Sequence, residues 1–295
     1  MIFLDPRSDI AFKKLFGSSE HKNVLMSFLN SVLELEGEKR IIDVVINDPN
    51  NVPETAEIKS TSVDVSCTDQ RNFKYIVEMQ VVNQNDYAER AQYYTAVALG
   101  RQLKKSEKFK LLSPVIFIGI LDFDLSDDGD FLSHHDIINR KTGKRLLRHM
   151  EWHFVELEKF NKTVDELDND LEKWLYLLKN ARTLDEIPSA LEKPDFEEAF
   201  DILEYGKLTV KELELYDRYI DAIRSRENQI DTAVEIAVEI AIANEQAKGE
   251  ANATKRFAKD LLTTTSMNII EIARLTRLSL EEIKKIKTEL AQEKK

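Results

Sequence analysis

Cysteine is almost absent from this chain, in which Cys67 is the single example among 295 residues. A lone cysteine excludes a disulfide framework and any zinc site built from several thiolates. Long apolar runs are also missing, since the longest, residues 113–123, is too short to cross a bilayer as a helix. Residues 1–6 have no basic segment followed by a long apolar core, so no signal peptide is predicted. These absences lead us to expect a cytoplasmic protein with no membrane partner.

Glycine is scarce as well. Only eight glycines occur, and none lies in the GxGxxG or GxxxxGK spacing of loops that hold nucleotide phosphates. We therefore expect no organic cofactor. Hydrophobic residues make up 42% of the chain, which is enough to bury a core in one large domain or two ordinary ones.

Charge is unevenly distributed along the chain. Acidic residues outnumber basic ones by 54 to 42, and the net charge of −12 argues against indiscriminate nucleic-acid binding. Residues 101–110 and 140–148 are nevertheless strongly basic. Such a segment is more often a solvated surface than a track for phosphates, and it gains significance only beside a catalytic site. On that condition the candidate DNA-binding residues are Arg101, Lys104, Lys105, Arg140, Lys141, Lys144 and Arg145.

The order of the expected elements predicts an α/β core followed by an all-α region. Strand patterns lie at residues 40–47, 61–68, 72–82, 114–122 and 151–157, with helices at 9–17, 24–35 and 86–105. Only helical patterns follow, at residues 164–180, 196–205, 210–228, 230–247 and 268–290. We therefore expect an α/β core over residues 1–160, a helical extension over 161–228, and a long helix with a helical hairpin over 229–295.

The last of these regions has two interpretations. Asp231, Glu235 and Glu239 form one acidic stripe on an otherwise apolar helix, a pattern that favours burial in a homo-oligomer. Residues 268–290 have the outline of a DNA-binding helix-turn-helix, although small helical hairpins often serve only for packing. Oligomerisation is the favoured interpretation, and DNA contact is the alternative.

The chemistry is concentrated in residues 63–82. Side chains alternate along a strand, so Glu78 and Gln80 share a face, and a hairpin would bring Asp64 close to Glu78. Two neighbouring carboxylates repel each other unless a cation neutralises them, and oxygen ligands favour Mg²⁺ or Mn²⁺. The backbone carbonyl of Met79 offers a further oxygen. On pattern alone, however, the favoured interpretation is that Asp64 and Glu78 are ordinary solvent-facing residues on an open sheet, because alternating strands commonly produce such pairs.

Several short motifs, in a fixed order along most of the chain, resemble those of a known protein family. Asp64 followed by Glu78-Met79-Gln80 resembles the PD-(D/E)xK nuclease signature, an acid on one strand and an acid-x-Lys on the next. The other matching segments are DIAFKKLFG at residues 9–17, VDV at 63–65, RAQYY at 90–94, PVIFI at 114–118 and LSLEEI at 278–283. On these residues the chain resembles the recombination-promoting nuclease/putative transposase family of bacteria.

The resemblance implies a restriction-endonuclease-like core, with a mixed central sheet flanked by helices, and Mg²⁺-dependent DNA cleavage in which Mn²⁺ substitutes. Asp64 and Glu78 match the two metal-binding acids, and Gln80 stands where the wider superfamily often has lysine. Asp9 matches an acid on the first helix, which the resemblance implies as an additional residue of the metal site. Lys74 shares the face of Glu78 but lies four residues away, too far to replace the missing lysine.

Arg90, Tyr93 and Tyr94 begin the helix after the Glu78 strand, where they either face the phosphate or pack against the sheet. The expected activity is endonucleolytic phosphodiester hydrolysis, linked to recombination, mobile elements or defence. The alternative is a weak or inactive nuclease descendant that binds DNA and assembles through its C-terminal helices. His134 and His135 are expected in a loop or on the surface, without a metal.

Overall fold

The computed structural model describes residues 2–48, 50–51, 61–265 and 267–293 of the chain. It divides into two compact units, Met1–Tyr219 and Ile220–Lys295. Residues 161–219, which follow the sheet in sequence, lie in the first unit together with it. Among the helices described, none is long and apolar enough to cross a membrane.

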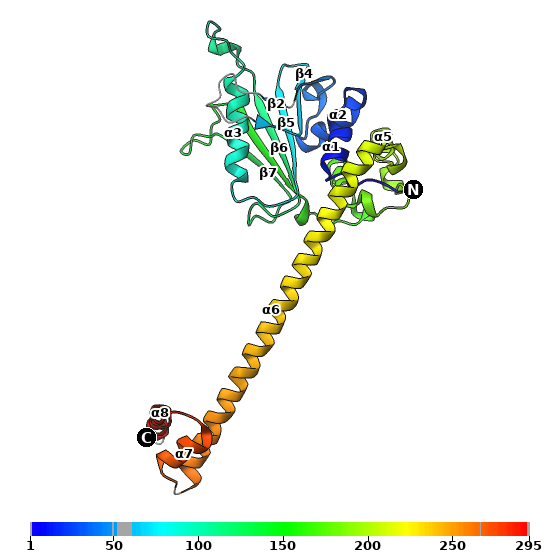
Figure 1. Cartoon of the computed structure of the whole chain (residues 1–295). Coiled ribbons are helices and arrows are strands. Elements are labelled where there is room, and N and C mark those ends of the chain that lie inside the picture. The colour runs from blue at the N-terminus through cyan, green and yellow to red at the C-terminus, as the bar shows by residue number, and fades with distance from the viewer. Residues whose placement is uncertain (1, 49, 52–60, 266, 294–295) are drawn as a thin grey trace. The chain divides into compact units, whose positions relative to one another are not determined.

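A mixed six-stranded sheet forms the centre of the first unit (Figure 1), in the order β1-β4-β5-β6-β8-β7. The strands are β1 (Val44–Ile46), β4 (Val65–Asp69), β5 (Lys74–Gln80), β6 (Val115–Leu121), β7 (Leu132–Asp136) and β8 (Met150–Glu156). β5, β6 and β8 run parallel, whereas β1, β4 and β7 join by antiparallel pairing. A separate antiparallel pair joins β2 (Asn50–Asn51) to β3 (Thr61–Ser62). The expected α/β core with a mixed sheet is confirmed.

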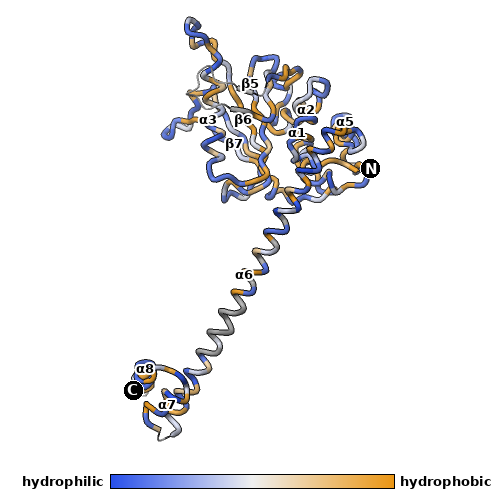
Figure 2. Tube along the Cα trace, viewed as in Figure 1, coloured by the Kyte–Doolittle hydropathy of each residue, from blue (hydrophilic) through white to orange (hydrophobic). Residues whose placement is uncertain are grey.

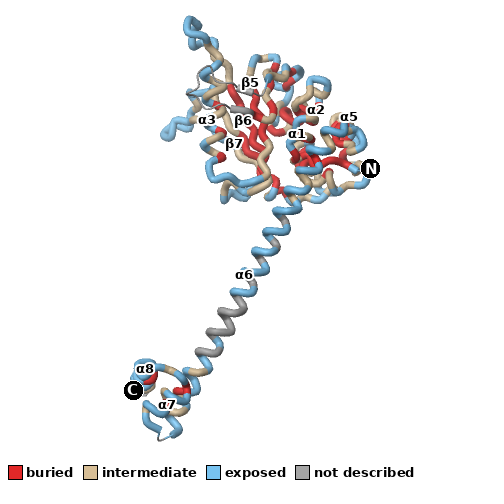
Figure 3. The backbone as a smooth tube through the Cα atoms, in the orientation of Figure 1, coloured by how far each residue is buried: buried red, intermediate tan, exposed pale blue. Residues whose placement is uncertain are grey.

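Helices cover both faces of this sheet (Figure 1). The α-helices of the first unit are α1 (Asp9–Phe16), α2 (Lys22–Val32), α3 (Tyr87–Gly100), α4 (Asp170–Asn180), α5 (Pro194–Ile202) and the start of α6 (Val210–Thr264). α3 packs on one face, where Tyr87 and Ala91 join Ile76, Phe117 and Phe154 in a buried cluster. The parallel strand β6 is buried along its whole length, as expected for a strand covered on both sides (Figure 3).

The helices on the other side of the sheet are held together by aromatic packing. The rings of Phe16, Phe28, Trp174 and Phe196 contact one another across α1, α2, α4 and α5, with centroids 4.7–6.0 Å apart. All four side chains are almost completely buried. Such clusters contribute strongly to stability because each ring removes a large apolar area from water. Cys67 is also fully buried, which raises the pKa of its thiol to about 12.

Two elements differ from the sequence-based expectation. β7, with the sequence LSHHD, places His134 and His135 on a strand rather than in a loop, but both are exposed, so the surface position also expected for them is confirmed. This strand lies at the edge of the sheet and is mostly exposed, so its sequence lacks the apolar alternation that marks a half-buried strand. Residues 210–228 and 230–247 were expected as separate helices but belong to the single helix α6, because no proline or glycine interrupts them.

The second unit contains the rest of α6 followed by α7 (Ile269–Thr276) and α8 (Leu280–Glu293). Ala258, Ile272, Ile283 and Ile286 form its small buried core. Asn268 caps α7 in a reciprocal arrangement with Glu271, which explains why the helix begins there. Along α6, hydrophobic and hydrophilic residues alternate (Figure 2), and Ile236 and Ile240 are more than half exposed. The side chain of Asp231, from the expected acidic stripe, lies outside the described residues, and Glu235 and Glu239 are exposed.

Candidate functional site

A tight hairpin places the two candidate acids side by side. Val65 pairs with Val77 and Ser66 with Ile76, so one further step of the register sets Asp64 opposite Glu78. The backbone N–H of Met79 donates a hydrogen bond to Asp64 Oδ2 at 2.9 Å. Because the N–H and C=O of one strand residue point toward the same neighbour, the carbonyl of Met79 also faces the Asp64 side.

Glu78 is buried, and Asp64 is half-buried. Glu78 retains only 7% of its exposure, and burial together with the charge of Asp64 raises its pKa to about 8. Burial also raises the pKa of Asp64, with a further contribution from Asp9, while the hydrogen bond from Met79 opposes the shift. Glu78 is therefore not a solvent-facing residue of an open sheet, the interpretation that the pattern alone had favoured. A raised pKa of this origin means that added positive charge would be strongly favoured at the pair.

Helix α1 contributes positive charge that the sequence did not reveal. Lys13 lowers the pKa of both Asp64 and Glu78 by its charge. Its Nζ lies 2.6 Å from Asp9 Oδ1, one helical turn earlier. Asp9 itself is well exposed and acts on Asp64 through its charge. The sequence could not predict that Lys13 acts on these acids, because α1 is placed beside the hairpin by contacts with residues far away in the sequence.

Helix α3 connects the remaining candidates to the acids. Arg90 Nη2 donates to Gln80 Oε1 at 2.5 Å, and Arg90 Nη1 donates to Gln84 Oε1 at 2.6 Å. The charge of Arg90 lowers the pKa of both Asp64 and Glu78. The charge of Glu78 adds to burial in raising the pKa of Tyr94, whereas Tyr93 is more exposed than Tyr94 and stacks beside it. Gln80, Arg90 and Tyr94 thus lie with the acids, and Tyr93 lies farther out.

Tyr87 fills a buried position that touches the same site. Its ring packs against Phe117 and Phe154, and its hydroxyl has no hydrogen-bond partner among the described residues. Gly119 pairs with Glu78 in the parallel register and lies directly beneath that hydroxyl. A Cβ at residue 119 would stand 2.4 Å from Tyr87 Oη and 3.0 Å from Phe154 Cδ1. The φ angle of Gly119 is not positive, so its backbone conformation does not require glycine. The close approach of Tyr87 and Phe154 does.

Gly119→Ala should therefore destabilise the first unit. The added methyl group collides with Tyr87 Oη, and overpacking of this kind costs about 1–3 kcal/mol. Urea denaturation followed by tryptophan fluorescence would measure the loss, because Trp152 and Trp174 are the only tryptophans and both belong to this unit.

Two further variants make the Gly119 test specific. Tyr87→Phe in the same chain removes the obstructing hydroxyl and should restore part of the lost stability, as a double-mutant cycle would show. Gly129→Ala should have little effect, since nothing lies within 4 Å of its added Cβ. A Gly119→Ala protein as stable as the parent would contradict the close approach.

The two basic segments lie away from the acids. They precede β6 and β8, whose first residues are neighbours, since Val115 N–H donates to the carbonyl of His149 at 2.9 Å. In the parallel register Lys74 is level with Val115 and Glu78 with Gly119. The basic segments are therefore about 13 Å from the level of Glu78 along the strands. The structure does not gather Arg101, Lys104, Lys105, Arg140, Lys141, Lys144 and Arg145 around Asp64 and Glu78.

The histidines form a pair of their own on the edge of the sheet. His134 and His153 are cross-strand partners on β7 and β8, and their Nδ1 atoms lie 2.5 Å apart. Burial and the neighbouring His153 lower the pKa of His134. One Nδ1 can donate to the other in this contact, with the roles set by the tautomers of the two rings. Within the described part of the chain, no group of three or more His, Cys, Asp or Glu side chains converges as metal ligands would.

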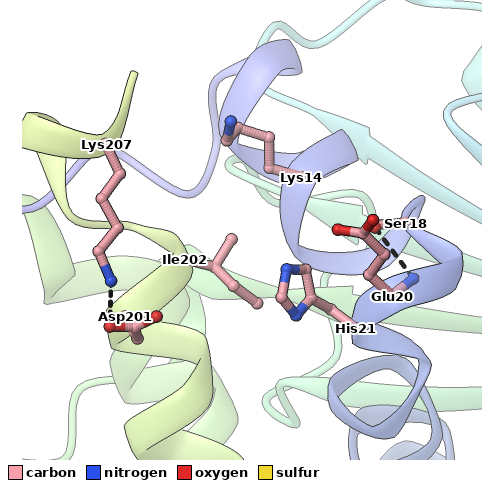
Figure 4. A pocket seen from close by; sticks show the side chains of 7 residues that line it. All are labelled: Lys14, Ser18, Glu20, His21, Asp201, Ile202 and Lys207. Atoms are coloured by element: carbon pink, nitrogen blue, oxygen red, sulfur yellow. Dashed lines mark hydrogen bonds and ion pairs between the residues drawn. The ribbon is translucent and has the colours of Figure 1, made fainter. Parts of the chain in front are cut away.

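A polar cavity of about 250 Å³ lies between the end of α1 and α5 (Figure 4). Each of its basic side chains has an acidic partner. Lys14 Nζ lies 2.7 Å from Glu212, His21 Nδ1 lies 3.0 Å from Glu198, and Lys207 pairs with Asp201. The cavity contains neither Asp64 nor Glu78. The Lys14 pair joins α1 to α6 and the His21 pair joins the turn after α1 to α5, whereas Lys207 and Asp201 both belong to the later segments. We interpret it as a packing seam.

The donor set at Asp64 and Glu78 fits a hard divalent cation. Mg²⁺ is commonly held by one or two carboxylates together with substrate phosphates, so a full protein cage is unnecessary. One buried and one half-buried carboxylate with raised pKa values, and a carbonyl at Met79 facing the same side, meet that requirement. Thiolates and grouped imidazoles, which suit zinc, are not part of the pair.

A family model described as PD-(D/E)XK nuclease family transposase matches residues 6–233. The chain matches no curated protein and no solved structure. The matched residues include α1, the hairpin of Asp64 and Glu78, the whole sheet and the beginning of α6.

Proposed function

This chain belongs to the PD-(D/E)XK nuclease family transposases, and on that premise we propose that it is a Mg²⁺-dependent DNA endonuclease. The observation that carries the proposal is the pairing of half-buried Asp64 with buried Glu78 on neighbouring strands, where burial raises the pKa of both carboxyls. The family supports a nuclease-like or mobile-element role. The proposal adds catalytic hydrolysis of phosphodiester bonds, in recombination, mobile-element movement or defence.

Each residue of the site has a role in this proposal. Asp64, Glu78 and the carbonyl of Met79 hold the ion, which supplies Lewis-acid activation of the phosphate and of water when it is bound. Gln80 orients the water or a phosphate oxygen by hydrogen bonding through its amide. Arg90 holds the carbonyl oxygen of that amide, so the NH₂ group of Gln80 is directed away from Arg90 and now donates to the carbonyl of Val82 at 3.0 Å.

Lys13 is the cation that we infer replaces the lysine absent at residue 80. Its charge acts on both Asp64 and Glu78, and it comes from α1 rather than from the acid-bearing strand. Asp9 positions the Lys13 ammonium through their 2.6 Å ion pair, which favours a supporting role for Asp9 over direct metal binding. Tyr94 faces the same site and is a candidate contact for the phosphate.

Cleavage of supercoiled plasmid tests the proposal directly. The purified protein should nick DNA with Mg²⁺ or Mn²⁺ and should be inactive with chelator or Ca²⁺. Asp64→Asn keeps the size of the side chain but removes its charge, and we expect it to reduce the rate at least about 100-fold, as loss of one preorganised electrostatic group does.

A matched control is available on the surface. Asp43 is an exposed carboxylate that pairs with Lys22, so Asp43→Asn should cleave like the parent protein. Equal cleavage by the Asp64→Asn protein would reject the site. A folded parent protein that binds DNA but never cleaves it would instead support the catalytically inactive DNA-binding descendant.

A further inference from the structure

The end of the sheet at which β6 and β8 begin lies away from the acids and has an unusual surface. We call it the basic edge, and it comprises residues 101–112 and 139–150. Phe109 and Leu146 are each 84% exposed there, and Leu111 and Leu147 are more than half exposed. Phe109 and Met150 line one cavity of about 460 Å³, so the first segment meets the end of the second. Exposed apolar side chains on both segments favour an interaction site over a bare surface.

The charge of the basic edge selects the kind of partner. Each segment contains five lysines or arginines, and the single carboxylate in the two is Glu107, which accepts a hydrogen bond from the backbone of Lys104. Arg145 is paired with Asp136 and Glu151, but these acids neutralise only that one side chain. The rest of this acidic chain is strongly negative by comparison. The partner is therefore a polyanion, and a second copy of the same edge would be repelled.

The arrangement of the apolar side chains distinguishes single-stranded from double-stranded DNA as the polyanionic partner. Phe109 stands between Lys108 and Lys110, and Leu146 and Leu147 stand between Arg145 and Arg148. In duplex DNA the bases are stacked inside and the backbone presents only charge and sugar. A single strand, in contrast, offers unstacked base faces beside its phosphates, which aromatic and cationic side chains bind together. A basic–apolar–basic sequence repeated in two neighbouring segments matches that alternation.

We propose that the basic edge binds single-stranded DNA, with Phe109 stacking on a base and the flanking lysines contacting phosphates. The inference rests on the proposed nuclease function, because it assigns the form of DNA that the protein holds beside its acids. α3 joins the two places, since Arg90 in its first half contacts Gln80 and its last residue, Gly100, leads into Arg101 (Figure 1). A strand that leaves the acids along α3 reaches the basic edge after about 15 Å, the length of helix from Arg90 to Gly100.

Binding measured without cleavage tests this proposal. Fluorescence anisotropy of the full chain in chelator would compare a labelled oligothymidine with a duplex of equal length. Loss of one stacked base costs about 1–3 kcal/mol, so Phe109→Ala should weaken single-strand binding roughly 5- to 150-fold. Its effect on the duplex should be much smaller. Lys108→Gln should lower the slope of log affinity against log salt by about 0.7 for the single strand.

The control for Phe109→Ala is Ile42→Ala, which removes an apolar side chain that is 74% exposed elsewhere on the first unit. It should leave binding unchanged. Unchanged single-strand affinity of the Phe109→Ala protein would overturn the proposal, as would an equal loss for both DNA forms or preferred binding to anionic vesicles. Phe109-dependent binding without any cleavage by the parent protein would reject the nuclease and keep the basic edge. Cleavage by the parent protein, together with binding that does not depend on Phe109, would keep the nuclease and reject the basic edge.

Discussion

Glu78→Gln should stabilise the metal-free protein at alkaline pH, although it removes one of the two acids on which the proposed activity depends. The parent carboxylate has a pKa of about 8 because burial and Asp64 disfavour its charge. In the unfolded chain a glutamate titrates near about 4.3. Each unit of difference is worth about 1.4 kcal/mol, so ionised Glu78 costs the folded state roughly 3–5 kcal/mol above pH 8. A neutral glutamine of the same shape avoids that cost.

The sign of the pH dependence follows from the raised pKa. The folded protein binds the Glu78 proton more tightly than the unfolded chain does, so the favourable contribution is complete below the unfolded pKa. It is lost as the pH rises toward about 8, where the folded carboxyl ionises. The free energy of unfolding of the parent protein should therefore fall between pH 5 and pH 8 relative to Glu78→Gln, by an amount on the order of 3 kcal/mol.

Urea denaturation in chelator at several pH values would measure this difference through tryptophan fluorescence. Adding Mg²⁺ or Mn²⁺ should stabilise the parent at alkaline pH and leave Glu78→Gln nearly unaffected, because ligand binding to the folded state stabilises it. Asp43→Asn again serves as the control, since Asp43 is exposed and its pKa is lowered, first of all by its hydrogen bond with Lys22. A stability gap that does not change with pH would contradict the burial of an ionisable Glu78.

Asp5→Ala should lower the free energy of unfolding of the first unit by about 3–5 kcal/mol, the range found when one partner of a buried ion pair is removed. Asp5 is only 1% exposed. Its carboxylate accepts hydrogen bonds from Arg7 Nε and Nη2 at 3.0 Å and from Tyr219 Oη at 3.3 Å. Alanine would leave Arg7 with Asp122 as its remaining acidic partner and would strand the Tyr219 hydroxyl.

Asp5→Asn and Asp201→Ala make this measurement specific. Asparagine keeps the shape and one acceptor, so its loss should be smaller than that of alanine. Asp201 also forms an ion pair, with Lys207, but its side chain is 64% exposed, and exposed pairs contribute about 0–1 kcal/mol. If Asp201→Ala proved as damaging as Asp5→Ala, burial would not explain the effect.

The local part of the site was predictable from sequence, and the long-range part was not. Alternation and a short polar turn were enough to predict the hairpin of β4 and β5, because the period of two fixes which side chains share a face. The same reasoning could not decide whether Glu78 faces water, since burial depends on α3 covering that face. Lys13 was invisible for a similar reason: its approach to the acids depends on how α1 packs, and no spacing in the sequence encodes it.

The fold shows the same division. Buried strands such as β6 were evident from their continuous apolar runs, whereas the edge strand β7 carries polar residues that fit a loop equally well. The basic segments were visible as charge, but their position relative to Glu78 required the parallel register of β5 and β6. That register places them at the opposite end of the strands from Glu78. Their proposed role is therefore to hold DNA away from the acids and not to line the cleavage site.

The contact between Asp5 and α6 also bears on how the protein is made. The backbone N–H of Asp5 donates to Tyr216 Oη at 2.8 Å, across 211 residues of chain. During synthesis the hairpin of Asp64 and Glu78 emerges long before Tyr216 exists, so this anchor of the N-terminal segment can form only after almost the whole first unit has been synthesised. The first unit is thereby closed by a contact between its two ends, which can form only when both ends are present.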